Sequence, residues 1–263
     1  MIRTALITTA GTKVAAALSC FLLVTGTGAA NAAEIKLLSA NAFESTMPGL
    51  LADFEKSSGH KVASEYQTAG AVADRIQKGE AVDVTIVTRS QIEALQIQGR
   101  VIANSRADIA KVGIGVFVGR GVSKPDISSV DAFRRSLLAT RSIAYIDPAS
   151  GGASGIFVAG LLERLGIAAE MKLKTKLAAP GGPLYEMVIK GDAEIGFNQI
   201  SEVVAQHRVE LIGPLPATIQ NYTLFAAGIV SSSKQVDAGS AFIGFLSSPT
   251  AAAVLTAKGF EPR

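Results

Sequence analysis

The sequence predicts an α/β protein of two lobes, in which each lobe is a mixed, mostly parallel sheet flanked by helices. Short β-branched apolar runs alternate with segments of helical periodicity through most of the chain. Two such strand–helix series are separated by a long, glycine-dotted apolar run at residues 112–118. A second extended run, residues 222–230, follows the second series. Two extended crossings between two series indicate two lobes joined by a two-strand hinge.

The N-terminal segment has the layout of a secretory signal peptide. Arg3 and Lys13 are the only charged residues before Glu34, and an apolar run at residues 14–24 is followed by small residues that end at Ala32. The apolar run is shorter than the roughly 20 residues that a membrane span needs. We therefore expect residues 1–32 to be removed by cleavage after Ala32, and the mature protein to lie in the periplasm.

The only cysteine, Cys20, lies inside this segment and offers an alternative, a lipid anchor. Leu18 stands one place too late for the lipoprotein pattern, and cleavage before Cys20 would cut the apolar run in half, so we favour cleavage after Ala32. The mature chain then has no cysteine and needs no disulfide. Without Arg3 and Lys13, 23 basic residues stand against 22 acidic ones, a net charge of +1. This balance disfavours nucleic acid and anionic membranes as partners.

The first series predicts a parallel sheet with its helices. Gly79 and Gly99 follow two of the apolar helical patterns and are typical helix ends. The predicted strands are residues 35–38, 61–66 and 82–87, and the predicted helices are residues 47–56, 71–78 and 91–98.

The second series repeats the rhythm. Its predicted strands are residues 142–146, 172–177, 194–197 and 209–212, and its helices are residues 156–165, 184–189 and 201–206; helices at 236–246 and 250–257 end the chain. We place the first lobe at residues 33–115 plus 225–263 and the second at residues 116–224, with crossings near Gly115 and Thr223. One continuous doubly wound sheet is the alternative.

The candidate ligand site lies in the loops that follow the strands. In open α/β sheets ligands bind beyond the carboxyl ends of the strands, where helix N-termini offer free N–H groups that suit anions. Five loops have this position, and four are small and polar: residues 39–45, 67–70, 147–155, 179–183 and 197–200. Each loop alone could be an ordinary helix cap, but together they favour a small anion between the lobes.

Other chemistries find little support. The only histidines are His60 and His207, and with no mature cysteine we expect neither a metal site nor a cofactor. The segment 152–156 lacks the last glycine of a Gly-x-Ser-x-Gly elbow, so a secreted hydrolase is disfavoured and we expect no catalytic residues and no enzyme. Arg75 could bind an anion as a carboxylate or oxyanion fork, but we favour a solvated residue or a surface ion pair with Asp74 or Glu80, which are close in sequence.

Several segments resemble the molybdate-binding, type II periplasmic solute-binding proteins of ABC importers, and the resemblance spans nearly the whole mature chain. These segments are residues 35–40, 82–86, 147–148, 154–157, 165–166 and 194–197. The resemblance implies a periplasmic receptor, expected to be a monomer, that captures a molybdate-like oxyanion or small carboxylate and delivers it to an ABC permease. A receptor that feeds a membrane sensor is the alternative.

The family holds its tetrahedral oxyanion by backbone N–H groups, two serine hydroxyls and a tyrosine. By resemblance, the serine places fall on Ala42 and Ala69, and the tyrosine place falls on Gln199. Thr68, Ser154 and Gln199 could replace part of these donors. The lost hydroxyls argue against molybdate and for another small anion, such as an organic carboxylate, because a desolvated anion needs its hydrogen bonds replaced. The predicted ligand-binding residues are Asn41, Ala42, Phe43, Thr68, Ala69, Gly70, Ser154, Gly181, Gly182 and Gln199.

Overall fold

The computed structural model describes residues 1–2, 5, 32–179 and 181–263. The predicted apolar run of the signal peptide and Cys20 lie outside the described residues. The expected cleavage after Ala32 therefore stays a prediction, and the fold is that of residues 32–263.

The first lobe is built on five strands in the order β2-β1-β3-β9-β4. β1 pairs in parallel with β2 and β3, whereas β9 runs antiparallel to both β3 and β4. The strands are β1 (Glu34–Ala40), β2 (Lys61–Gln67), β3 (Val84–Thr88), β9 (Tyr222–Ile229) and β4 (Ala107–Gly119).

Several helices of the first lobe begin at a side chain that accepts from one of their first N–H groups. Thr68 caps α2, and Thr88 with Gln91 forms a capping box on α3. The helices are the short 3-10 helix η1 (Asn41–Phe43) and α1 (Met47–Ser58), α2 (Ala69–Gln77), α3 (Arg89–Ile97), α9 (Val236–Leu246) and α10 (Pro249–Ala257). In the part of the chain that the structure describes, no single helix is long and apolar enough to cross a membrane; α9 and α10 meet the criterion only as a pair bent by 59°.

The second lobe uses the far half of β4. β7 and β8 pair antiparallel with this half, and β5 lies parallel between β7 and β6. Its strands are β5 (Ile143–Ile146), β6 (Thr175–Ala178), β7 (Ile195–Gln199) and β8 (Val209–Pro214). Its helices are α4 (Val130–Ala139), the 3-10 helix η2 (Pro148–Ser150), α5 (Ala153–Arg164), α6 (Ala168–Lys172), α7 (Leu184–Ile189) and α8 (Ile200–Val203).

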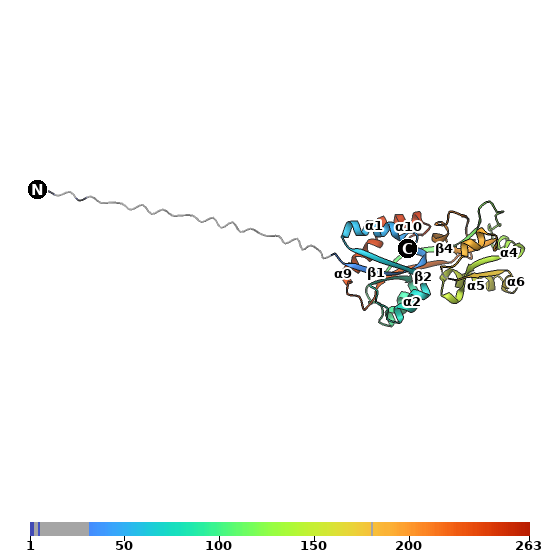
Figure 1. The fold of residues 1–263 in the computed structure, drawn as a ribbon, viewed down its shortest axis with the longest axis horizontal. Helices are drawn as coiled ribbons and strands as arrows, with labels where there is room; N and C mark the ends of the chain where they lie inside the picture. Colours follow the sequence, from blue (N-terminus) through green and yellow to red (C-terminus); the bar gives the residue numbers. More distant parts are fainter. Residues whose placement is uncertain (3–4, 6–31, 180) are drawn as a thin grey trace. The chain divides into compact units, whose positions relative to one another are not determined.

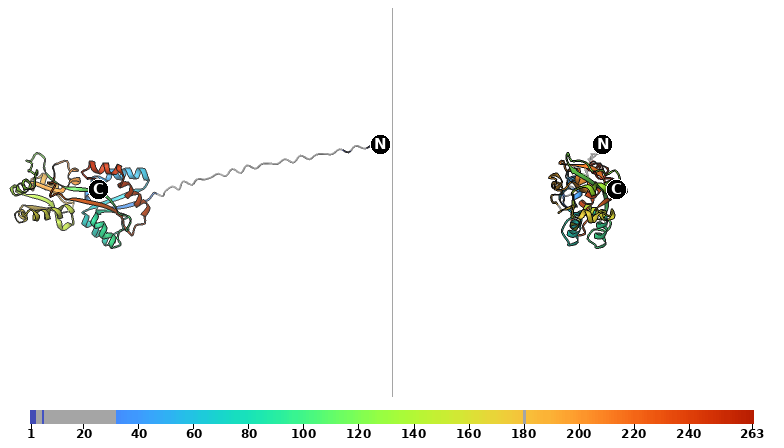
Figure 2. Two further views of the ribbon diagram at one scale, coloured as in Figure 1. Left: turned by 180° about the vertical axis from the view of Figure 1, so that it is seen from behind. Right: turned by 90° about the vertical axis from the view of Figure 1, so that its right-hand side faces the viewer.

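β4 belongs to both lobes. Up to Gly113 it pairs with β9, and from Ile114 onward it pairs with β7 and β8. Hydrogen bonding is therefore continuous between the lobes, although the lobes lie side by side as two bodies (Figures 1 and 2). The amide of Gln220 braces this crossing, since it accepts from the N–H of Ile114 and donates to the C=O of the same residue, both at 2.9 Å. The predicted two-lobed α/β fold with a two-strand hinge is thus the observed architecture.

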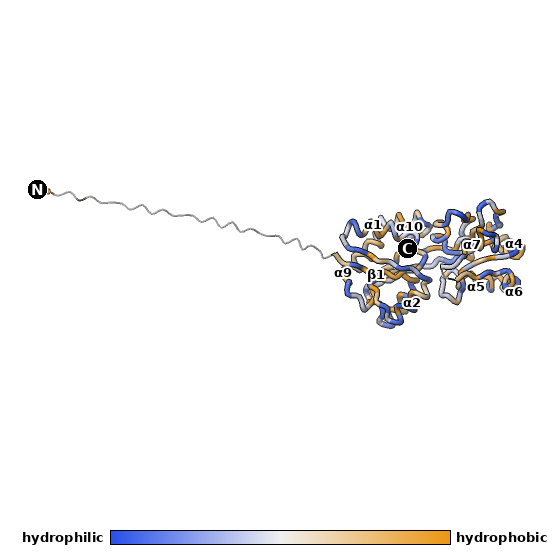
Figure 3. The backbone as a smooth tube through the Cα atoms, in the orientation of Figure 1, coloured by the Kyte–Doolittle hydropathy of each residue, from blue (hydrophilic) through white to orange (hydrophobic). Residues whose placement is uncertain are grey.

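Separate hydrophobic clusters stabilise the lobes. One packs under β1, β3 and β9 around Phe43, Phe54 and Phe242. In the second lobe one cluster surrounds Phe133 and Phe197, and a smaller one lies on the other side of the sheet. Figure 3 shows hydrophobic residues along the strands and hydrophilic ones on the surrounding loops. Each lobe thus buries its own core, which leaves the space between them free for a ligand.

The structure differs from the predicted elements in several places. The helix predicted at residues 201–206 is shorter, because α8 ends at Val203. Residues 130–139 form α4, which was not predicted from the sequence. Ser129 caps this helix, and Phe133 and Leu137 are buried at helical spacing. The strand predicted at 172–177 is wrong at its start, because Lys172 ends α6 and β6 begins at Thr175. β4 is longer than the predicted run 112–118, because its first residues are paired to β9.

Candidate ligand site between the lobes

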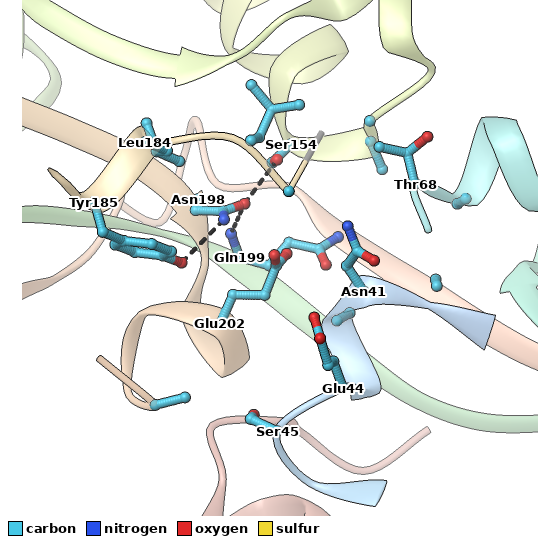
Figure 4. Close-up of a pocket in the computed structure, with 18 of the residues that line it drawn as sticks. Asn41, Glu44, Ser45, Thr68, Ser154, Leu184, Tyr185, Asn198, Gln199 and Glu202 are labelled. Atoms are coloured by element: carbon cyan, nitrogen blue, oxygen red, sulfur yellow. Dashed lines mark hydrogen bonds between the residues drawn. The ribbon is translucent and has the colours of Figure 1, made fainter. Parts of the chain in front are cut away.

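A cavity of ≈ 320 Å³ lies between the lobes, at the carboxyl ends of β1 and β7 and the N-terminal ends of α2 and α5 (Figure 4). This is the position that ligands take in α/β sheets. Eight of the ten predicted site residues line it: Asn41, Ala42, Thr68, Ala69, Ser154, Gly181, Gly182 and Gln199. Loops far apart in the sequence therefore meet here, as expected.

The other two predicted residues do not line the cavity. Phe43 is fully buried in the first lobe, where its ring contacts those of Phe225 and Phe260 at centroid distances of 5.4 and 4.7 Å. Its large apolar ring belongs to the core, and so its predicted role in the site is not supported. Gly70 lies against the second lobe, and its N–H donates to the C=O of Gly151 over 3.1 Å.

Small side chains and helix starts shape the wall of the cavity. Ala42 and Ala69 stand where bulkier residues would reduce its volume. Ala69 is the first residue of α2, and Ala153 and Ser154 are the first two residues of α5. The first N–H groups of a helix have no partner within that helix and carry partial positive charge. The wall therefore offers backbone donors to a negatively charged group.

Two hydroxyls expected to replace missing donors are already engaged. Thr68 Oγ1 accepts from the N–H of Ala71 at 3.3 Å and donates to the C=O of Ser150 at 2.7 Å. Ser154 Oγ donates to Asn198 Oδ1 at 2.9 Å. Each hydroxyl carries one hydrogen, and here both hydrogens are used within the protein. Thr68 and Ser154 therefore position the loops rather than offer free hydrogen-bond donors.

Two amide side chains approach the centre of the cavity from opposite lobes. Asn41 comes from η1 of the first lobe, and Gln199 ends β7 of the second. Figure 4 shows the two amides directed toward one another. Gln199 is buried, with 3% of its surface exposed. These amides can both donate to and accept from a ligand that lies between the lobes.

The cavity lining includes further polar residues that were not predicted from the sequence: Glu44, Ser45, Tyr185, Asn198, Glu202 and Gln206. Tyr185 OH accepts from Asn198 Nδ2 at 3.0 Å, and Asn198 Oδ1 also accepts from the N–H of Gln199 at 2.9 Å. Glu44 and Asn198 lie inside two of the five predicted loops, whereas Glu202 follows the last of them by two residues. A search extended by one helical turn would have found it.

The two carboxyl groups dominate the electrostatics. Glu44 and Glu202 come from different lobes, and both are directed into the cavity (Figure 4). Burial raises the pKa of Glu202 to about 7; the Asn198 amide opposes this, and the negative charge of Glu44 adds to it. Burial likewise raises the pKa of Tyr185 well above its ordinary value, and the charge of Glu202 adds to that shift. Among the residues that the structure describes, no lysine, arginine or histidine lines the cavity.

The residues set aside in the sequence lie away from this site. Arg75 forms ion pairs with Glu65 and Glu80, which confirms the surface ion-pair reading. His60 Nδ1 accepts from the N–H of Ala33 at 3.1 Å. Within the described ranges, no group of three or more histidine, cysteine, aspartate or glutamate side chains could hold a metal ion.

Comparison with known proteins finds a family model and relatives that match most of the chain. A family model described as bacterial extracellular solute-binding protein matches residues 35–261. An aconitate isomerase from Pseudomonas sp. is 30% identical over 234 residues, which cover 87% of each chain. The molybdate-binding protein ModA of Azotobacter vinelandii is 27% identical over 237 residues, 88% of this chain and 91% of that one.

Solved structures share the fold. The periplasmic molybdate-binding protein of Azotobacter vinelandii superposes with a TM-score of 0.74 at 22% identity and covers 87% of this chain and 99% of its own. The sulfate-binding protein SubI of Mycobacterium tuberculosis H37Rv gives a TM-score of 0.71 at 17% identity and covers 88% of this chain and 87% of its own.

Proposed function

Since the chain belongs to the family of bacterial extracellular solute-binding proteins, we propose that it is a periplasmic receptor that captures a small organic carboxylate and delivers it to an ABC permease. The observation that carries the choice of ligand is the lining of the cavity. Helix N-termini supply donors for an anion, and two carboxyl groups face inward. Ala42 and Ala69 stand at the positions where the resemblance to the family implies hydroxyls that hold a tetrahedral oxyanion.

The size of the cavity supports a ligand larger than an oxyanion. A volume of ≈ 320 Å³ corresponds to about ten water molecules at ~30 Å³ each. A central atom with four oxygens would leave much of this space to water. An organic acid with several carbon atoms would fill more of it and bring more groups within reach of the Asn41 and Gln199 amides.

The charge of the lining supports the same choice. A fully ionised inorganic dianion would meet Glu44 and Glu202, and no basic side chain among the described residues of the lining would offset these charges. A carboxylate is compatible with this lining when a carboxyl group of the site or of the ligand carries a proton. The relative named aconitate isomerase, at 30% identity, also points to a carboxylate rather than to molybdate.

Membership of this family also supports the proposal that the protein is exported. Receptors of ABC importers work outside the cytoplasmic membrane, and residues 1–32 have the layout of a cleaved signal peptide. We therefore place the mature protein in the periplasm, with Ala33 as its first residue. Mass spectrometry of exported protein tests this; a mature terminus at Cys20 would contradict it.

A thermal-shift series tests the choice of ligand. Mature protein is heated with molybdate, sulfate, monocarboxylates, dicarboxylates and tricarboxylates, each at the same concentration and pH. A ligand at about a hundred times its Kd stabilises the folded state by about 2.7 kcal/mol, which corresponds to a rise in Tm of about 5–10 °C for a chain of this size. We expect this rise with a carboxylate. A rise with molybdate or sulfate alone would contradict the proposal.

A second candidate function is isomerisation of an unsaturated tricarboxylate. It is favoured by the 30% identity to an aconitate isomerase and by a carboxyl group with a pKa of about 7 inside the cavity. Such a group can act as a general base near neutral pH. It would take a proton from the allylic carbon of the substrate and return one to the far alkene carbon, so that the double bond moves and no other atom is exchanged.

Proton NMR in D₂O separates the two candidates. Purified protein is incubated with cis-aconitate, and both trans-aconitate and deuterium at carbon are followed. An isomerase produces both, and Glu202→Gln lowers its rate by about 10²–10⁴-fold. If the protein binds cis-aconitate but does not convert it, the isomerase function is excluded and the receptor function remains.

A further inference from the structure

The cavity combines two features that oppose one another. Its helix starts favour a negatively charged ligand, yet Glu44 and Glu202 bring two carboxyl groups to the same space from opposite lobes. No basic side chain in the described lining offsets them. An anion can enter this site at low cost only if one of these charges is removed when it binds.

We propose that Glu202 carries a proton when the cavity is occupied and donates it to a carboxylate oxygen of the ligand, so that capture of the anion takes up a proton. This inference rests on the proposed function, because it requires a carboxylate ligand. It assigns to Glu202 the role of a neutral hydrogen-bond donor. The resemblance to the family implies serine hydroxyls in this role at positions 42 and 69, where this chain has Ala42 and Ala69.

The surroundings of Glu202 identify it, rather than Glu44, as the protonated group. Glu202 is half-buried in α8, whereas Glu44 is exposed. The groups of the cavity that face Glu202 are the phenol of Tyr185 from α7, the amides of Asn198 and Gln199 from β7, and the carboxyl of Glu44 from the first lobe. None of these is cationic. The raised pKa of Glu202, about 7, agrees with this arrangement, and a bound anion would raise it further.

Calorimetry measures the proton directly. Trans-aconitate is titrated into mature protein at several pH values between 5.5 and 8.5, and at each pH in two buffers of different ionisation enthalpy. We expect the wild type to take up more protons than Glu202→Gln near pH 7–8 and to lose affinity about tenfold for each pH unit there. Glu202→Gln keeps a donor of similar shape, so it should bind with a much flatter pH dependence.

Two controls make the result decisive. The ligand's own proton equilibria are identical for wild type and variant, so only the difference between the two proteins reports on Glu202. Glu44→Gln removes the second charge and should shift the loss of affinity to lower pH while keeping its slope. Equal proton uptake and equal pH dependence in wild type and Glu202→Gln would overturn the inference, while the receptor function would stand.

A ligand-free measurement tests the same group independently. A carboxyl whose pKa rises from 4.5 to about 7 on folding stabilises the folded protein below pH 4.5, and this stability is lost as the pH rises through about 7. In urea titrations, the free energy of unfolding of the wild type should therefore fall with rising pH more than that of Glu202→Gln. Failure of every carboxylate, trans-aconitate included, to bind at pH 5.5 would instead overturn the receptor function and the inference together.

Discussion

At the scale of single residues, Asn198 organises the second-lobe wall of the site. It is 1% exposed. Its side chain accepts from Ser154 Oγ and from the N–H of Gln199 and donates to Tyr185 OH. One amide thus fixes the start of α5, the end of β7 and a ring of α7 in a single arrangement. Such a network is costly to break, because every partner left behind is desolvated.

Asn198→Ala therefore tests this network. The substitution leaves three groups without their partner, so we expect the free energy of unfolding to fall by about 2–4 kcal/mol in urea titrations. Ser154→Ala removes only one donor to Asn198 and should cost about 1 kcal/mol. Equal losses for the two variants would contradict the central role of Asn198.

Glu194 predicts how the fold responds to acid. Its carboxylate accepts from Thr140 Oγ1 at 2.6 Å and from the N–H of Arg141 at 2.8 Å, and it also pairs with the Arg141 guanidinium. These contacts, the Thr140 hydroxyl first, lower the pKa of Glu194 from 4.5 to about 2. The stability they give is present above pH 4.5 and is lost as the pH falls toward 2. The free energy of unfolding, measured from pH 6 to pH 2, should fall less for Glu194→Gln than for the wild type. Parallel declines would contradict this assignment.

The sequence predicted which loops meet at the cavity better than it predicted the contacts of their side chains; the assignment of these residues to a ligand stays a prediction. Eight of ten predicted residues line the cavity, because strand ends and helix starts can be read from apolar periodicity and small polar loops. Whether a hydroxyl donates to a ligand or to a neighbouring loop depends on tertiary contacts such as Thr68 to Ser150. The charge on Glu202 is likewise set by burial and by Glu44, a residue far away in the sequence.

At the scale of elements, β7 shows how a glycine allows close packing behind the site. Gly196 pairs with Ala144 of β5 and with Phe117 of β4. A Cβ at Gly196 would lie 2.1 Å from the ring of Phe117, which is itself fully buried against Tyr185. The strand therefore needs a residue without a side chain at this point.

Gly196→Ala should destabilise the protein strongly, because the Phe117 ring has no free space to move into. We expect a loss of about 2–4 kcal/mol in urea unfolding. Gly244→Ala is the matched control: this glycine is exposed in α9, nothing lies within 4 Å of its added Cβ, and alanine should add about 0.5–1 kcal/mol of stability. A neutral effect of Gly196→Ala would show that β7 can shift away from β4.

The elements missed from the sequence have physical reasons. The first half of β4 carries Asp108 and Lys111 among its apolar residues, so the sequence gives no continuous apolar run there. These residues form a strand because they pair with β9. β6 was predicted with the wrong start because it is short and half of its residues are exposed, so no apolar run marks where it begins. α4 could have been predicted, since Ser129 and the buried Phe133 and Leu137 give it a cap and a helical face.

At the scale of the whole molecule, the predicted resemblance to molybdate-binding-like periplasmic proteins is confirmed by the family match and by the shared fold. The lobes touch at one edge of the cavity. There Thr68 Oγ1 donates to the C=O of Ser150, and Gly70 meets Gly151. These contacts join the start of α2 to the loop before α5, so we expect them to break when the lobes open. The predicted hinge at the β4 and β9 crossings would open this edge to admit a ligand.

Gly70→Ala tests closure without disturbing either lobe. Gly70 is the second residue of α2, where alanine suits the helix, but its Cβ would lie 2.7 Å from Gly151 Cα and 2.9 Å from Gly151 O. We expect unchanged or slightly higher stability without ligand, and an affinity about 10–100-fold lower for the carboxylate that stabilises the wild type most. In small-angle scattering the wild type should contract on saturation with that carboxylate, while Gly70→Ala should contract less. If the variant binds and contracts as the wild type does, the lobes can close without the close approach of Gly70 to Gly151, and the proposed role of this contact is wrong.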